Sequence, residues 1–464
     1  MRSAEKTAFA EFGKAPVPTP RAQSIVRSVT GFTAACVLVS NVIGTGIFTT
    51  TGFLARDIGD PSLILLLWVI GGALSLAGAL SYSELGAAMP HVGGEYVYIR
   101  EAYGRMAAFL SGWASFTVGF GAALAASVMG FSSYCLALFR ELGFTALPLN
   151  DKSVALVALW GLTVVHTAGV GVGGLVQRVL TAVKVGAIGV LIVAGFGGGH
   201  GNWGNLGITN LDTQFSLSKA AVSLIFITFA YSGWNAAGYI AGEIINPVRN
   251  LPKAMVGGTV FVSILYVALN VVYLYALPVT ELQGVVAVAE KAAVGLFGPR
   301  AALFVTVLLC LSILGSASAM IWAGPRVYYA MAVDGVFPTV VSHVRGASGA
   351  PVKAIILQSS WATLLVITGT FEQLVVYAGF VLALFSTVAV GSVIVLRWRA
   401  PQMQRPFRVR PYPLVPLIFV LVSTATMVWT LVGRPVESLF GVATVLSGLP
   451  AYFFFGARKK TAPQ

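Results

Sequence analysis

The sequence is poor in charged residues. Only 10% of its 464 residues are Asp, Glu, Lys or Arg, whereas soluble globular proteins carry about 25%. Hydrophobic residues make up 57% of the chain, and a soluble fold of this size could not bury that much apolar surface. The composition therefore excludes a soluble protein and predicts an all-α polytopic membrane protein, built as one helical bundle in the lipid bilayer.

Cysteine is equally scarce. Cys36, Cys135 and Cys310 lie inside apolar stretches, without metal-ligand spacing and without an evident disulfide partner. No cluster of His, Cys and Asp has the pattern of a metal site. We therefore expect buried thiols, no metal and no cofactor.

The formal net charge is +13, but it does not indicate nucleic acid binding, because most Lys and Arg residues flank apolar runs. If the N-terminus is cytoplasmic, 21 of the 29 Lys and Arg residues fall in cytoplasmic segments and seven in external loops. This excess predicts that both termini are cytoplasmic. Residues 1–28 lack the apolar core of a signal peptide and are expected to form a cytoplasmic tail, as are residues 456–464.

Twelve apolar runs are long enough to cross a bilayer, which takes about 20 residues as a helix. We therefore predict 12 transmembrane helices. The runs are 29–53, 61–89, 103–139, 151–168, 172–195, 218–243, 252–277, 299–331, 352–369, 372–397, 413–432 and 435–455.

One cation lies in the middle of a run. Lys184 is halfway along 172–195, where a charge costs several kcal/mol unless it faces a polar interior with a partner. The alternative is a lysine that snorkels to the interface. Its depth in the run favours the buried, partnered position.

Two runs are interrupted by glycine and small polar residues. The first contains the stretch 41–48, Asn-Val-Ile-Gly-Thr-Gly-Ile-Phe, and the sixth contains 229–235, Phe-Ala-Tyr-Ser-Gly-Trp-Asn. The two runs would enter the membrane from opposite sides. Interrupted helices at corresponding places in two inverted halves indicate a transporter's binding site. Close helix packing through small residues is the alternative.

Such interruptions would expose backbone groups to a ligand. Amide N–H groups at the start of the second half-helix suit a carboxylate, and carbonyls at the ends of the first half-helices suit an ammonium group. Together they would bind a zwitterion, namely a free amino acid. The amides belong to Thr45, Gly46 and Ile47 and the carbonyls to Val42, Ile43, Phe229 and Ala230.

The acidic residues bear on the side chain of that ligand. No Asp or Glu lies at the middle of a predicted span; those that fall within the runs, such as Glu84 and Glu243 at cytoplasmic ends, lie near span ends. No acid would neutralise a basic side chain at mid-membrane, and only Lys184 could meet an acidic one. We therefore expect a neutral amino acid.

Four stretches, in this order along most of the chain, resemble the amino acid–polyamine–organocation (APC) superfamily, and most closely its L-type amino acid transporters and their bacterial relatives. The stretches are Gly44-Thr45-Gly46-Ile47-Phe48; 78–86 with 93–98; 229–235 with 243–252; and 315–335.

The resemblance implies a LeuT-type fold with two inverted five-helix repeats, 29–195 and 218–397, followed by two helices within 413–455. It also implies roles for single residues. Phe229 would close over the substrate, and Lys184 would replace a sodium ion, bridging the first break to Ser312 or Ser316. Substrate would contact Val42, Ile43, Gly44, Thr45, Gly46, Ile47, Phe229, Ala230, Ser232 and Asn235.

The chain departs from the animal L-type pattern in two places. The loop 140–150 has no cysteine, so a disulfide-linked heavy subunit is not expected, and a bacterial protein in the inner (plasma) membrane is. Ser232 stands where relatives often have glycine, and its hydroxymethyl group would narrow the pocket.

The sequence thus predicts a sodium-independent secondary transporter of neutral L-amino acids, working as an exchanger. A proton-coupled symporter and a transport-inactive amino acid sensor are the alternatives. A channel is disfavoured because no repeated filter loop or charged ring is present. An enzyme is not expected, because the spans contain no paired catalytic acids and no Ser/Lys or His/Glu motif.

Overall fold

The computed structural model describes residues 26–143, 150–207, 217–344, 349–369, 371–433 and 435–457. Within these ranges all regular secondary structure is helical, and one isolated β-bridge joins Val29 to Ile244. Nine helical segments among the described residues are long and apolar enough to cross a membrane. The protein is therefore an all-helical, multi-pass membrane protein. Most of the two predicted tails lies outside the described residues.

The helices follow one another along the chain with few long connections. In order they are α2 (Gly31–Val42), α3 (Gly46–Asp57), α4 (Pro61–Ala88), α5 (Glu95–Tyr103), α6 (Arg105–Ala114), η2 (Ser115–Gly119), α7 (Gly121–Glu141), α8 (Asp151–Thr167), α9 (Val170–Gly198), η3 (Trp203–Leu206), α10 (Leu217–Ala230), α11 (Ala236–Tyr239), η4 (Ala241–Glu243), α12 (Pro247–Ala276), α13 (Val279–Leu282), α14 (Val288–Phe297), α15 (Arg300–Val333), η5 (Thr339–Ser342), α16 (Val352–Thr368), α17 (Phe371–Arg399), α18 (Leu414–Gly433) and α19 (Pro435–Ala457).

Each predicted run falls on one helix or on a series of shorter ones. The runs 29–53, 103–139 and 218–243 are each divided into pieces, whereas the other nine coincide with single helices. Helices α8 and α16 have only 17 residues each and α10 has 14, which is short for a bilayer core of about 30 Å. The number of twelve spans therefore stays a prediction.

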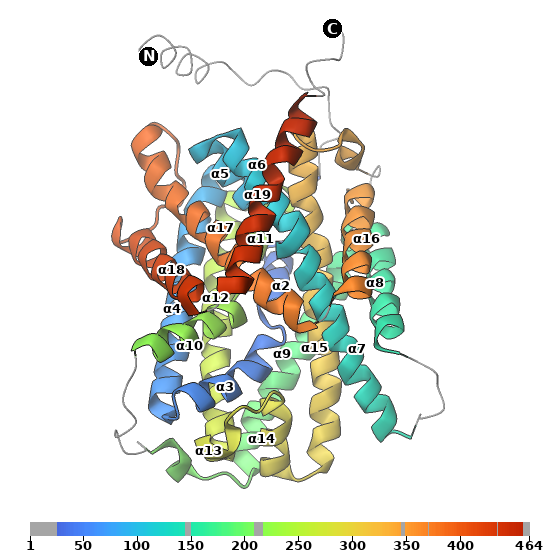
Figure 1. Ribbon diagram of the computed structural model, residues 1–464, viewed down its shortest axis with the longest axis vertical. Coiled ribbons are helices and arrows are strands. Elements are labelled where there is room, and N and C mark those ends of the chain that lie inside the picture. The colour runs from blue at the N-terminus through green and yellow to red at the C-terminus, as the bar shows by residue number, and fades with distance from the viewer. Residues whose placement is uncertain are drawn as a thin grey trace.

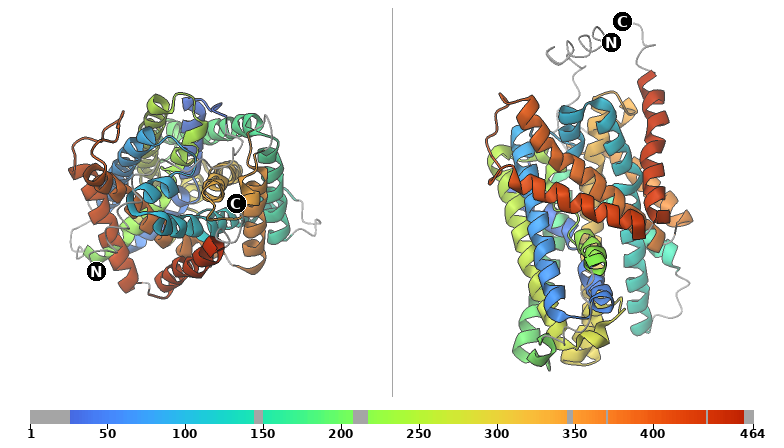
Figure 2. Two further views of the ribbon diagram at one scale, coloured as in Figure 1. Left: turned by 90° about the horizontal axis from the view of Figure 1, so that it is seen from above. Right: turned by 60° about the vertical axis from the view of Figure 1, so that its left-hand side comes forward.

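The centre of the bundle is formed by a few long helices. Helix α12 packs against α4 and α2, and α15 packs against α7 and α9. Helices α18 and α19, at the red end of the colour scale, cover one flank from outside (Figure 2), and they are the least buried of the candidate spans. The core thus lies around α2, α12 and α15.

Short helices close the two ends of the molecule. In Figure 1, α13 and α14 lie at one end and α5 at the other, while α2 and α3 lie between them. These three short helices fall in predicted loops, because each is too short to produce a membrane-length apolar run. Their positions leave the interrupted helices enclosed midway along the bundle.

Candidate functional site

The first interruption separates α2 from α3. Helix α2 ends at Val42 and α3 begins at Gly46, with Thr45 at its N-cap and no side-chain cap. The first amide N–H groups of a helix have no partners within it. A Cβ atom on Gly46 would lie 2.7 Å from the Ala230 Cα, so glycine is needed here for the first break to approach the second.

The second interruption follows α10, which ends at Ala230, and a turn leads into α11 at Ala236. Gly233 in this turn has a φ of +100°, which favours glycine. A Cβ atom there would also lie 3.0 Å from the Asn41 Oδ1. The two breaks therefore touch each other at both glycines.

Two buried side chains bind the carbonyls that the breaks leave free. The Lys184 ammonium on α9 donates to the carbonyls of Ser40 at 2.9 Å and Ile43 at 2.6 Å. The Tyr266 hydroxyl on α12 lies 2.8 Å from the Val42 carbonyl and 3.2 Å from that of Ala230. Because a hydroxyl carries one hydrogen, Tyr266 can donate to only one break at a time.

Helix α15 supplies two hydroxyls to the same region. Ser312 donates to the Ile43 carbonyl at 3.5 Å, which it shares with Lys184, and Ser316 donates to the Asn41 carbonyl at 3.3 Å. Lys184 is 1% exposed, so its ammonium lies within the bundle and not at an interface. The first break is thus held from α9, α12 and α15 together.

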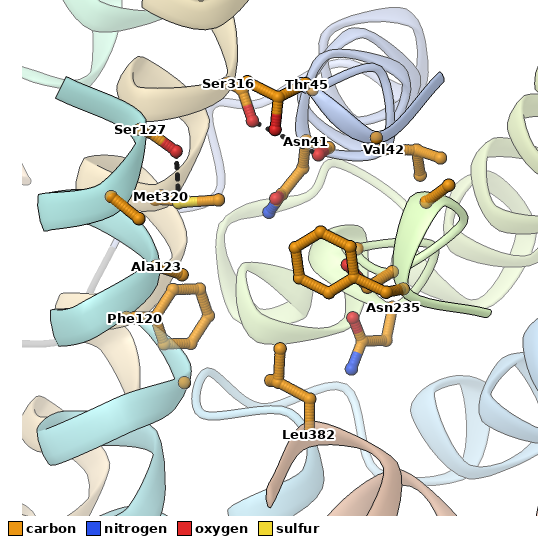
Figure 3. A pocket seen from close by; sticks show the side chains of 18 of the residues that line it. Asn41, Val42, Thr45, Phe120, Ala123, Ser127, Asn235, Ser316, Met320 and Leu382 are labelled. Atoms are coloured by element: carbon orange, nitrogen blue, oxygen red, sulfur yellow. Dashed lines mark hydrogen bonds between the residues drawn. The ribbon is translucent and has the colours of Figure 1, made fainter. Parts of the chain in front are cut away.

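A pocket lies between the two breaks, the start of α7 and α15 (Figure 3). Asn41, Val42 and Thr45 form one part of its wall, and Phe120 and Ala123 face them from α7. The full lining is Asn41, Val42, Gly44, Thr45, Gly46, Gly119, Phe120, Ala123, Ala126, Ser127, Phe229, Ala230, Ser232, Gly233, Asn235, Tyr239, Ser316, Met320 and Leu382.

Most residues expected at a substrate site line this pocket. They are Val42, Gly44, Thr45, Gly46, Phe229, Ala230, Ser232 and Asn235, joined by Ser316. Ile43 and Ile47 are fully buried and do not appear in the lining. Lys184 and Ser312 lie behind the break, where they contact the Ile43 carbonyl.

The α7 wall was not expected from the sequence. It follows a π-helical turn, η2 (Ser115–Gly119), which brings Gly119 and Phe120 into the lining. Single π-turns inside α-helices occur often at functional sites. The local sequence Ser-Phe-Thr-Val-Gly gives no clear signal for one, since the i to i+5 register depends on packing.

Several tyrosines were also missed, because tyrosine in a span is usually taken for an interface anchor. Tyr239 lines the pocket, and Tyr266 contacts both breaks.

A third omission is Glu95, which lies near a predicted span end but is only 3% exposed. A Tyr82 hydroxyl donates to it at 2.9 Å, so a buried acid is in fact present near the pocket.

The break carbonyls differ in their capacity to bind a ligand. The Val42 carbonyl accepts from the Gly44 N–H at 2.8 Å, and from the Tyr266 hydroxyl at 2.8 Å whenever that hydroxyl does not donate to Ala230, which then uses its two lone pairs. The Phe229 carbonyl accepts one bond, from the Ser232 N–H at 2.9 Å. The pocket can therefore offer amide donors at the start of α3 and a carbonyl acceptor at the end of α10.

Sequence comparison with known proteins finds a family and relatives that match most of the chain. The profile of the family described as "Amino acid permease" matches residues 29–450. The human "Large neutral amino acids transporter small subunit 2" is 31% identical over 432 residues, 91% of this chain and 79% of the relative.

Two further relatives carry related names. The human "b(0,+)-type amino acid transporter 1" is 31% identical over 447 residues, 94% of this chain and 89% of the relative. The mouse (Mus musculus) "Asc-type amino acid transporter 1" is 28% identical over 441 residues, 94% of this chain and 82% of the relative.

Proposed function

The chain belongs to the amino acid permease family, and from this premise we propose that it is a secondary transporter of neutral L-amino acids that exchanges them without sodium. Membership confirms the resemblance to the APC superfamily and shows a transport protein, not an enzyme. The observation that carries the proposal is the pocket where two interrupted helices meet. Pockets of this kind suit the two charged ends of an amino acid.

The architecture we propose has twelve transmembrane helices in a LeuT-type arrangement. Residues 29–195 and 218–397 would be inverted five-helix repeats, and 413–455 would contain the last two helices. The breaks support this proposal, because each falls in the first helical run of its repeat. Alternating access would then expose the pocket to each side of the membrane in turn.

In the pocket, the substrate carboxylate would accept hydrogen bonds from the amides of Thr45 and Gly46, at the positive end of α3. The ammonium group would donate to the Phe229 carbonyl, since that of Val42 already accepts from Gly44 and is shared with Tyr266. The Phe229 ring would cover the substrate and act as a gate. Ser232 would limit the space around it.

Sodium independence would depend on Lys184. Its ammonium places a fixed positive charge against the Ser40 and Ile43 carbonyls, a position where a bound cation would otherwise be needed to hold the break. No neighbouring anion is required, because carbonyl oxygens are suitable ligands for a cation. The resemblance implies that Lys184 replaces a sodium ion, and the contacts of its ammonium group with the two carbonyls support this role.

We further propose that the protein is bacterial, lies in the plasma membrane with both termini in the cytoplasm, and works without a disulfide-linked heavy subunit. The absence of cysteine between Arg140 and Asn150 supports the last point. Most of this loop lies outside the described residues, so this point rests on its sequence alone. The words "small subunit" occur in the name of the human relative and are said of that protein.

Uptake into proteoliposomes would test the proposal. Purified protein would be assayed with all twenty amino acids, with and without sodium, with and without internal substrate, and across a pH gradient. We expect uptake of neutral amino acids that internal substrate accelerates and that sodium does not change. Uptake driven by the pH gradient alone would favour proton symport instead. Binding without any uptake would favour a sensor.

A further inference from the structure

The π-turn in the pocket wall is contacted from behind by a helix that does not reach the pocket. The turn η2 places Gly119 and Phe120 in the lining, and Figure 3 shows Phe120 on the wall that faces Asn41. Helix α16, which lies wholly within the described part of the chain, contributes no residue to the lining. It nevertheless packs against α7, which carries this wall.

One side chain of α16, Trp361, contacts the turn at three points. Its indole N–H donates to the Thr117 carbonyl at 3.0 Å. Its ring centroid lies 5.7 Å from that of Phe116. A Cβ atom on Gly121 would lie 2.5 Å from the Trp361 Cδ1, so the indole can approach this closely only because residue 121 is glycine. Trp361 thus contacts the turn itself and the first residue of α7.

A second residue of α16 reaches the pocket wall from the same side. Gln358 is three residues before Trp361, so the two side chains are neighbours on the helix surface. The Gln358 Nε2 donates to the carbonyl of Met320, which lines the pocket, at 3.1 Å. A Cβ atom on Gly324 would lie 2.2 Å from the Gln358 Oε1 and 2.7 Å from the Phe120 Cγ. This face of α16 therefore supports the part of the wall that carries Phe120.

The turn has a backbone register that its own sequence does not explain. The Phe120 N–H donates to the Ser115 carbonyl at 2.8 Å, an i to i+5 bond, whereas π-helices are rare and appear mostly as single turns. The Ser115 carbonyl also accepts from the Tyr328 hydroxyl on α15 at 3.4 Å. The turn is thus held by one side-chain donor from α15 and one from α16.

We propose that Trp361 is a positioning residue: it holds the π-turn, and with it Phe120, at the distance from the two breaks that decides how large a substrate side chain fits. The proposal rests on the proposed function, since it assumes an amino acid in this pocket. Protein interiors are close-packed, so a change of even one methylene group is felt by the neighbouring atoms. A change of volume behind the wall should therefore move the wall.

Two substitutions should move it in opposite directions. Trp361→Phe removes the N–H donor and part of the ring, so the wall can withdraw from the pocket. Gly121→Ala adds a methyl group between the turn and the indole, which pushes the wall inward. Equilibrium binding of leucine and alanine would be measured on the purified full-length variants.

The ratio of leucine affinity to alanine affinity is the readout. It should rise about tenfold in Trp361→Phe, which is the lower end of the effect of one methylene group in an apolar pocket. In Gly121→Ala it should fall below the parent's value. Loss of stability alone would lower both affinities and leave their ratio unchanged.

Helix α8 offers a matched control for each substitution. Trp160→Phe also removes an indole donor to α16, since the Trp160 N–H donates to the Thr363 hydroxyl at 3.1 Å. Gly161→Ala also adds a methyl group to a helical glycine, at a position where nothing lies within 4 Å. Both controls should keep the parent's ratio, and thermal unfolding of every variant would show that it is folded.

The outcomes distinguish this proposal from the proposed function. If either test variant keeps the parent's ratio, or if both shift it in the same direction, the positioning role of Trp361 is wrong. An equal shift in Trp160→Phe would also contradict it, because the turn would then not be the cause. If Trp361→Phe does not fold, the direction of the shift in Gly121→Ala decides. If the folded parent binds no amino acid, the proposed function itself fails, and this proposal with it.

Discussion

At the residue scale, the two glycines of the first break, Gly44 and Gly46, differ in what surrounds them. A Cβ atom on Gly46 would collide with the Ala230 backbone, whereas one on Gly44 would meet only the Ser316 hydroxyl oxygen at 3.5 Å. Substitution at Gly46 therefore changes the packing of the two breaks, and substitution at Gly44 changes mainly the space in the pocket. Only substitution at Gly44 therefore tests contact with a ligand without disturbing the packing of the two breaks.

We predict that Gly44→Ala keeps the parent's apparent melting temperature but weakens amino acid binding by about tenfold. A methyl group in a close-packed contact costs about 1–3 kcal/mol. Gly46→Ala should lower both stability and binding. Thermal unfolding and equilibrium binding of the purified variants would check this. Parent-like binding in a stable Gly44→Ala would contradict the proposed approach of the substrate to the backbone.

A second residue-scale prediction concerns Phe229, which lines the pocket and lies 3.7 Å from the position of a Cβ on Gly379. Phe229→Ala should reduce uptake by about tenfold or more, because in the proposed exchange mechanism its ring seals the site. Phe229→Trp should retain part of the activity. The ratio of uptake to surface expression is the measurement, and parent-like turnover in the alanine variant would remove Phe229 from the mechanism.

At the element scale, the structure shows why some features could be predicted and others could not. The breaks at 43–45 and 231–235 can be recognised in the local sequence, because glycine and small polar residues interrupt an apolar run. The π-turn η2 and the burial of Glu95 cannot be recognised in this way, since both depend on which helices pack nearby. The same holds for Tyr266, whose role comes from its position opposite both breaks.

Lys184 joins helix α9 to the first break, while Thr181 and Arg178 of the same helix hydrogen bond to α2 before the break. Removing the Lys184 ammonium leaves two buried carbonyls without this donor, and an unsatisfied buried group costs about 1–3 kcal/mol. Lys184→Ala should therefore lose most uptake, in sodium-free and in sodium-containing buffer alike. Lys152→Ala is a suitable control, because Lys152 also donates to a carbonyl, that of Ile367, but at an exposed position.

Uptake by both lysine variants, measured across a pH series, would decide the role of α9. An active Lys184→Ala at every pH would show that the break holds without this contact. Sodium dependence in the parent would contradict the proposal that the ammonium replaces a cation.

At the scale of the whole molecule, one buried ion pair connects three parts of the chain. Glu243 and Arg326 are 0% and 2% exposed, and the Arg326 Nε lies 2.6 Å from the Glu243 Oε1. Trp322 donates to the other carboxylate oxygen at 3.1 Å. The Glu243 carbonyl also accepts the N–H groups of Ser28 and Val29. The segment before α2, the short helix η4 and α15 are thus held together.

Breaking this pair from one side should be costly, because it leaves an uncompensated buried charge, at about 3–5 kcal/mol. Arg326→Met should therefore lower the apparent melting temperature strongly. The double variant Glu243→Gln/Arg326→Met should recover much of the loss, since both charges are gone. Arg56→Met provides the control: the Arg56–Asp57 pair is solvent-exposed, and such pairs contribute about 0–1 kcal/mol. If the double variant is as unstable as the sum of Arg326→Met and Glu243→Gln, the two charges do not stabilise each other, and α15 must be held to η4 by apolar packing instead.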